Sequence, residues 1–192
     1  MSNFIFLDMD GVLNSNNLID EWFTTKEKEL EHLIEDNVER YKAVKQAFSK
    51  EFVHSTELVM PELAARFTKL VTDVNANIIW SSTWRILDKY AKWETAKEMF
   101  NRRGLPGDRL IGYTPNFNYF RMPFNELRVR EINSVIHNKQ FGINKKSKIV
   151  IIDDLDLSAL DNSKNIRFFQ TNIKEGLTET ISDKIKTFLL GD

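Results

Sequence analysis

The sequence predicts an α/β protein in which helices cover both faces of a doubly wound parallel sheet. Apolar runs too short for helices alternate along the chain with amphipathic segments of helical length. This alternation is typical of parallel strands joined by right-handed helical crossovers. The 192 residues, 42% of them hydrophobic and 29% charged, are enough for one well-packed core with room for an insertion.

The strands are predicted from short runs that are rich in apolar residues. The strongest run is KIVIIDD, in which four consecutive apolar residues lead into two acids. Five strands are predicted in all: residues 3–8, the NANIIW run, residues 109–114, KIVIIDD and residues 166–171.

The helices are predicted from apolar residues that recur every three or four positions. The longest such segment spans residues 26–52, and Thr24 with Glu27 predicts a capping box at its start. This segment is long for one globular helix, so we expect a break near Asp36 and Asn37. Further helices are predicted over residues 61–73, 87–103 and 126–140, and from Thr178 to about Leu190.

Residues 115–125 predict a loop, because they include two prolines and several aromatic residues. An aromatic and basic set suited to holding a nucleotide lies in and beside this loop: Tyr113, Phe117, Tyr119, Phe120 and Arg121. The alternative is a loop that packs its own side chains together.

Composition narrows the class of protein. The absence of cysteine excludes a disulfide framework and a thiolate metal site. No signal-peptide pattern or membrane-spanning apolar run is visible, so we expect a cytoplasmic protein without membrane contact, in the host cytoplasm if a phage encodes it. The net charge of −1 argues against general nucleic-acid binding. Residues 101–148 nevertheless hold ten basic and three acidic side chains, which could line a phosphate-rich site or form a solvated surface.

Polar side chains end three of the predicted strands, in the runs LDMD, IWSST and IIDD. In open α/β sheets, ligands bind beyond the carboxyl ends of the strands. If these strands are neighbours, Asp8, Asp10, Asp153 and Asp154 meet there, and they need a compensating cation. Hard oxygen ligands of this kind suit Mg²⁺.

These runs also carry a family resemblance. DMDGV, IIWSS and IVIIDD resemble the first, second and fourth motifs of the haloacid dehalogenase (HAD) superfamily. The resemblance implies a Rossmann-like three-layer α/β/α core made of residues 1–14 and 59–192, with a small helical cap inserted at residues 15–58. The elements DMDGVLN, SSTWR, R-x-x-E-I and GLT look most like the HAD domains of phage and bacterial nucleic-acid (RNA) repair proteins.

The resemblance implies a role for each motif residue. Asp8 would be the nucleophile that forms an aspartyl-phosphate, and Asp10 would be the general acid and then the general base. Asp8, Asp10 through its carbonyl, Asp153 and Asp154 would hold Mg²⁺. Ser81 would bind a phosphoryl oxygen. Ser82 and Thr83 lie next to it, and a one-residue error in register would exchange the roles of these residues. Such hydroxyls could instead be helix caps.

The third motif, which usually supplies a lysine, departs from the family pattern. Matching R-x-x-E-I favours Arg128 as the cation, with Arg130 and Lys148 as the other candidates. Trp84 and Arg85 could stack a base and contact a phosphate, or could simply be buried.

The resemblance therefore implies a Mg²⁺-dependent phosphatase. We expect it to act on a phosphomonoester of a nucleotide or of a nucleic-acid end, such as a 3′-phosphate. One alternative is a 5′-nucleotidase that acts on free mononucleotides. An alternative of another class is a module that binds a phosphate or a partner without catalysis.

Overall fold

The computed structural model describes residues 2–51, 58–86, 93–117 and 122–191. A five-stranded sheet has the order β3-β2-β1-β4-β5, and every pairing in it is parallel. The strands are β1 (Asn3–Leu7), β2 (Ala76–Trp80), β3 (Leu110–Tyr113), β4 (Lys148–Asp153) and β5 (Ile166–Gln170). The five predicted strands and the α/β fold class are confirmed.

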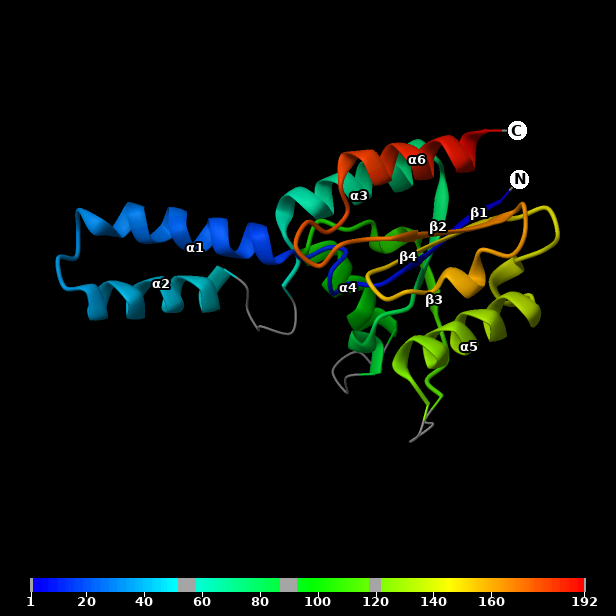
Figure 1. Ribbon diagram of the computed structural model, residues 1–192, viewed down its shortest axis with the longest axis horizontal. Coiled ribbons are helices and arrows are strands. Elements are labelled where there is room, and N and C mark those ends of the chain that lie inside the picture. The colour runs from blue at the N-terminus through cyan, green and yellow to red at the C-terminus, as the bar shows by residue number, and fades with distance from the viewer. Residues whose placement is uncertain (1, 52–57, 87–92, 118–121, 192) are drawn as a thin grey trace.

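Helices cover both faces of the sheet, which gives the predicted three layers. Figure 1 shows α3 and α6 on one side of the sheet and α5 on the other. The helices are α1 (Asn16–Glu31), α2 (Asn37–Glu51), α3 (Pro61–Asp73), α4 (Trp93–Arg102), α5 (Phe124–His137) and α6 (Glu179–Leu190). Among the described residues, no helix is both long and apolar enough to cross a membrane.

The core is built from strand residues that alternate between the two faces. Ile5 and Leu7 of β1 belong to the apolar cluster formed with α3, α4 and α6. Phe4 and Phe6 belong to the cluster formed with α5. Because both faces are buried, β1 is a continuous apolar run, as parallel strands usually are.

The predicted capping box at Thr24 and Glu27 is wrong. The helix begins earlier, at Asn16, because the Ser15 hydroxyl accepts a hydrogen bond from the Leu18 N–H and caps it there. Thr24 lies inside α1, where its hydroxyl donates to the Asp20 carbonyl. Leu18, Ile19 and Trp22 pack against the core, and their spacing was the signal for the earlier start.

The predicted break near Asp36 and Asn37 is confirmed. The Asp36 carboxylate accepts hydrogen bonds from the N–H groups of Val38 and Glu39 and so caps α2. Helices α1 and α2 form a hairpin that projects from the core, on the left of Figure 1. The hairpin lies within the predicted insertion, and its action as a cap stays a prediction.

The remaining helices agree with prediction except at their ends. Helix α4 begins at Trp93, and residues 87–92 of the predicted helix lie outside the described residues. Helix α5 begins at Phe124, two residues before its predicted start, and ends at His137. Thr178 caps α6 as predicted, because its hydroxyl accepts from the Ile181 N–H. Of the loop's aromatic and basic set, Tyr119, Phe120 and Arg121 lie outside the described residues.

An ion-pair cluster ties α3 to α6 and gives a pH-dependent prediction. The Asp73 carboxylate accepts hydrogen bonds from Lys186 and Lys69, each at 2.7 Å, and these bonds lower the pKa of Asp73 to about 2. A lowered folded-state pKa stabilises the protein above the unfolded-state value of 3.8, and this stabilisation disappears as the pH falls towards 2. We expect Asp73→Asn to lower the free energy of unfolding near neutral pH, with a difference from wild type that shrinks in acid. Urea denaturation across this pH range measures it.

The control for this prediction is Glu98→Gln, an exposed acid on α4. We expect it to change the free energy of unfolding by no more than about 0.5 kcal/mol. A constant difference for Asp73→Asn across the same pH range would mean that the two lysines do not act on Asp73 in solution.

Candidate active site

Three carboxylates meet at the carboxyl edge of the sheet. Strands β1 and β4 are neighbours, with Leu7 beside Ile152, so Asp8 after β1 comes to lie next to Asp153 at the end of β4. The Asp8 N–H continues the ladder by donating to the Ile152 carbonyl at 3.0 Å. One carboxylate oxygen from each of Asp8, Asp153 and Asp154 lies within 4.8 Å of the others.

Arg128 of α5 is the cation that contacts this group. Its side chain is 2% exposed, and its Nη1 lies 3.0 Å from Asp153 Oδ2 and 3.4 Å from Asp8 Oδ1. Arg130, two residues further along the helix, is exposed. Lys148 begins β4 at the opposite edge of the sheet, where its amine donates to the carbonyls of Phe188 and Gly191. Of the three candidates for the third motif, the structure therefore brings Arg128 to the carboxylates.

Burial makes the charged forms of these acids costly. It raises the pKa of Asp153 to about 8, and the Asp8 carboxylate acts in the same direction while Arg128 opposes it. Burial also raises the pKa values of Asp8 and Asp154, against the opposing charge of Arg128. One guanidinium therefore does not balance three carboxylates, and a divalent cation would complete the balance.

The donor set fits such a cation. Asp8, Asp153 and Asp154 offer three hard oxygen ligands in one place, which suits Mg²⁺ or another hard divalent ion. The Asp10 carboxylate is not in this group. Its predicted contribution to the metal site is through its backbone carbonyl.

Asp10 is held by two side chains instead. Its Oδ2 accepts a hydrogen bond from the Trp84 indole N–H at 2.9 Å, and its Oδ1 accepts one from the Asn14 amide at 3.0 Å. Asn14 also accepts from the Gly11 N–H at 2.7 Å and so closes the turn after β1. Trp84, considered above as a stacking surface, thus positions Asp10.

Gly11 gives a prediction with a matched control. Its φ is +66°, and a Cβ added there would lie 2.7 Å from the Asp154 side chain. We expect Gly11→Ala to lose stability and, because Asp154 must shift, most of the metal-dependent activity that we propose below. Gly104 has a similar φ of +72° but open space around it, so Gly104→Ala should cost only the backbone strain of about 1–2 kcal/mol. Thermal unfolding and activity assays compare the two variants, and equal losses in both would contradict the clash with Asp154.

The hydroxyls after β2 have different surroundings. The Ser81 N–H donates to the Leu7 carbonyl, and the Ser81 hydroxyl is buried with no hydrogen-bond partner within the described ranges. The Ser82 hydroxyl accepts from the Trp84 N–H, and its position near the Asp8 carboxylate opposes the rise in the pKa of Asp8. Thr83 begins a short 3-10 helix and is partly buried. The Ser81 hydroxyl thus has no protein partner among the described residues, and its role as the ligand of a phosphoryl oxygen, rather than Thr83, stays a prediction.

Arg85 is buried among protein acceptors. Its guanidinium donates to the carbonyls of Ser82, Thr114 and Pro115 and to the Glu131 carboxylate. These contacts tie the turn after β2 to the loop after β3 and to α5. They favour a positioning role over the contact with substrate considered above.

Glu131 was not singled out as a site residue from the sequence. Its two oxygens accept from Arg85 at 2.5 Å and from the Phe117 N–H at 3.0 Å, and it lies 4.0 Å from the Arg128 guanidinium. The three-residue spacing of Arg128 and Glu131 on one helix was the available signal, since it places both on the same face.

Comparison with known families agrees with these motifs. A profile of the family described as the HAD domain in Swiss Army Knife RNA repair proteins matches residues 4–181. Searches of curated proteins and of solved structures give no significant match.

Proposed function

Because this chain belongs to the family of HAD domains found in Swiss Army Knife RNA repair proteins, we propose that it is a Mg²⁺-dependent phosphatase. The proposed substrate is a phosphomonoester on a nucleotide or on a nucleic-acid end, and the proposed location is the cytoplasm. The observation that carries the proposal is the buried Asp8 carboxylate, which lies beside Arg128, Asp153 and Asp154 at the carboxyl edge of the sheet.

Asp8 is the nucleophile in the proposed reaction. Its oxygen attacks phosphorus, the bond from phosphorus to the ester oxygen breaks, and an aspartyl-phosphate forms. Arg128 offsets the charge of Asp8 and Asp153 as the anionic substrate approaches. The Ser81 hydroxyl, which has no hydrogen-bond partner in the part of the chain that the structure describes, can donate to a phosphoryl oxygen. A divalent ion held by Asp8, Asp153 and Asp154 would supply further positive charge at the phosphoryl group.

Asp10 moves the protons. It donates a proton to the leaving oxygen as the ester bond breaks, and it then accepts one from the water that attacks the aspartyl-phosphate. Phosphate and free Asp8 result. The hydrogen bonds from Trp84 and Asn14 hold the Asp10 carboxylate at a fixed position for both transfers.

Removal of divalent metal tests the proposal. We expect EDTA to abolish phosphate release from p-nitrophenyl phosphate and from a 3′-phosphorylated oligonucleotide, and Mg²⁺ to restore it. Mg²⁺ should also raise the melting temperature of the wild type, because a ligand that binds only the folded state stabilises it. Asp154→Asn should lose this rise. Full activity in EDTA would contradict the proposed metal dependence.

The same assay separates the candidate substrates. Faster hydrolysis of a 3′-phosphorylated oligonucleotide than of mononucleotides, with activity that falls steeply as salt rises, would support binding of a nucleic-acid end. Preference for free mononucleotides would favour the 5′-nucleotidase alternative. Phosphate binding without turnover of any of these substrates would favour the non-catalytic module.

A further inference from the structure

A pocket lies at the amino-terminal ends of the strands, at the opposite end of the sheet from the three carboxylates. It has a volume of about 320 Å³ and is formed by the end of α5, the loop before β4 and the starts of β4 and β5. Ile149, the second residue of β4, lines it, whereas Asp153 ends the same strand. At about 3.3 Å per residue, the two lie roughly 13 Å apart along the strand. The pocket is therefore separate from the candidate active site.

The rim of this pocket is basic. His137, Lys139 and Lys145 line it, and no acidic side chain is among its lining residues in the described part of the chain. Neither lysine forms an ion pair with any residue that the structure describes. Two lysines and a histidine around one hollow, with no acid among the lining residues that the structure describes, favour an anionic ligand.

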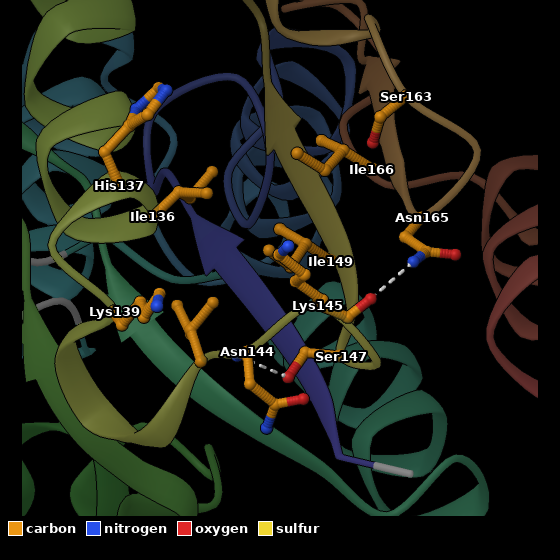
Figure 2. Close-up of a pocket in the computed structure, with 11 residues that line it drawn as sticks. Ile136, His137, Lys139, Asn144, Lys145, Ser147, Ile149, Ser163, Asn165 and Ile166 are labelled. Carbon is orange, nitrogen blue, oxygen red and sulfur yellow. Dashed lines mark hydrogen bonds between the residues drawn. The ribbon is translucent and has the colours of Figure 1, made fainter.

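The floor of the pocket is apolar. Figure 2 shows isoleucine side chains in the middle of the pocket, with His137 and Lys139 on one side of them and Asn165 on the other. The isoleucines are Ile136, Ile143, Ile149 and Ile166. An apolar floor with a few polar groups around it is the usual composition of a small-molecule site, and the volume lies at the small end of the range of about 300–1,000 Å³ for such sites.

The turn that carries Lys139 is held in place by packing. Lys139 and Phe141 both have left-handed backbone conformations, with φ of 50° and 56°. The Phe141 ring fills the space above Gly112 of β3, where an added Cβ would lie 2.1 Å from the ring. Such conformations persist only where the surrounding structure holds them, so the position of Lys139 at the rim is maintained by the fold.

From this arrangement, we propose that the pocket binds a nucleotide phosphate. The flat base lies against the isoleucine floor, and the phosphate lies between Lys139 and Lys145. Two sources share this chemistry: a free nucleotide, and a nucleotide unit within an RNA strand. Nucleotide binding at this pocket does not depend on the proposed phosphatase activity. The suggestion that the nucleotide belongs to an RNA strand does rest on that proposed function.

The test is a titration followed by amide NMR resonances. The protein is Asp8→Asn in EDTA, so that no hydrolysis occurs, and the probe is adenosine 5′-monophosphate. We expect shifts in residues 136–149 and 163–166 that saturate in the millimolar range or below. Shifts confined to the carboxyl edge of the sheet, or no shift at about 10 mM, would overturn the proposal.

Variants sharpen the test. Lys139→Glu and Lys145→Glu should each weaken binding of the probe by about tenfold, and Ser163→Trp should block the pocket from its exposed side. The control Lys184→Glu, an exposed lysine on α6, should change it by no more than about twofold. Equal weakening by the control would overturn the proposal.

Further probes test the role of each part of the nucleotide and the source of the ligand. Adenosine alone and inorganic phosphate alone should each bind more weakly than the nucleotide. Binding of phosphate alone as tight as that of the nucleotide would overturn the role of the apolar floor. The last probe is an RNA oligonucleotide without terminal phosphates. If it shifts the same resonances, the natural ligand is a nucleotide unit within an RNA strand. If only the mononucleotide shifts them, the natural ligand is a free nucleotide. The pocket variants, assayed with Asp8 present, should keep their hydrolysis of p-nitrophenyl phosphate. Failure of nucleotide binding at the pocket is thus distinguishable from failure of the proposed catalysis.

Discussion

Asp8→Asn is expected to reduce phosphate release by at least about 10³-fold while the protein stays folded. The amide has nearly the same shape as the carboxylate but is a poor nucleophile, so it does not form the aspartyl-phosphate. The stability of the metal-free protein should not fall. Burial raises the pKa of Asp8, which means that the ionised group is unfavourable where it lies. Single-turnover kinetics and thermal unfolding in EDTA measure the two effects.

The control for Asp8→Asn is Asp108→Asn. Asp108 is an exposed acid in the short 3-10 helix before β3. We expect it to keep wild-type kinetics. If Asp8→Asn kept more than about a tenth of the wild-type rate, the covalent mechanism would be wrong, and water would have to attack the substrate directly.

Arg128→Met is expected to impair both stability and catalysis. The substitution leaves two buried carboxylates, Asp8 and Asp153, without the guanidinium that contacts them. Breaking a buried ion pair in this way typically costs about 3–5 kcal/mol. We also expect kcat to fall by about 10²–10³-fold, because a fixed positive charge next to the nucleophile is lost. Urea denaturation and steady-state kinetics, with Mg²⁺ present, measure both effects.

Arg130→Met is the matched control for Arg128→Met. It removes the same group from the same helix, but Arg130 is exposed, so we expect a change in stability within about 0.5 kcal/mol. Arg128→Lys should recover part of the activity, because it keeps the charge but loses the planar fork. A loss of kcat in Arg130→Met as large as that in Arg128→Met would overturn the assignment of Arg128 to the third motif.

The sequence was sufficient for features that depend on local pattern. The five strands could be predicted because each is a short apolar run that ends in polar residues. The runs LDMD, IWSST and IIDD also predicted that the candidate site lies at the carboxyl ends of the strands. The capping box at Thr24, in contrast, failed because local pattern does not settle where α1 begins. Two serine or threonine residues could start α1, and the choice depended on how Leu18, Ile19 and Trp22 pack against the core.

The choice among Arg128, Arg130 and Lys148 needed the tertiary structure. Arg128 and Arg130 lie about 200° apart around a helix with 3.6 residues per turn, so only one of them can face the sheet. The packing of Ile132 and Val135 against the sheet decides which one it is. For Lys148 the sequence already favoured elimination, because it begins the predicted strand that Asp153 ends, and the structure adds that its amine donates to the carbonyls of Phe188 and Gly191.

The sequence by itself determined the strand and helix pattern, the acids at the carboxyl ends of the strands and the family resemblance. Each of these depends on residues that are close together in the chain. The tertiary structure alone decided that Arg85 is tied to Glu131, 46 positions further along the chain, and that Trp84 holds Asp10. It also decided that His137, Lys139 and Lys145 surround one pocket. The physical reason is that these contacts depend on the rotation of α5 and the register of the sheet, which arise from packing between segments far apart in the chain.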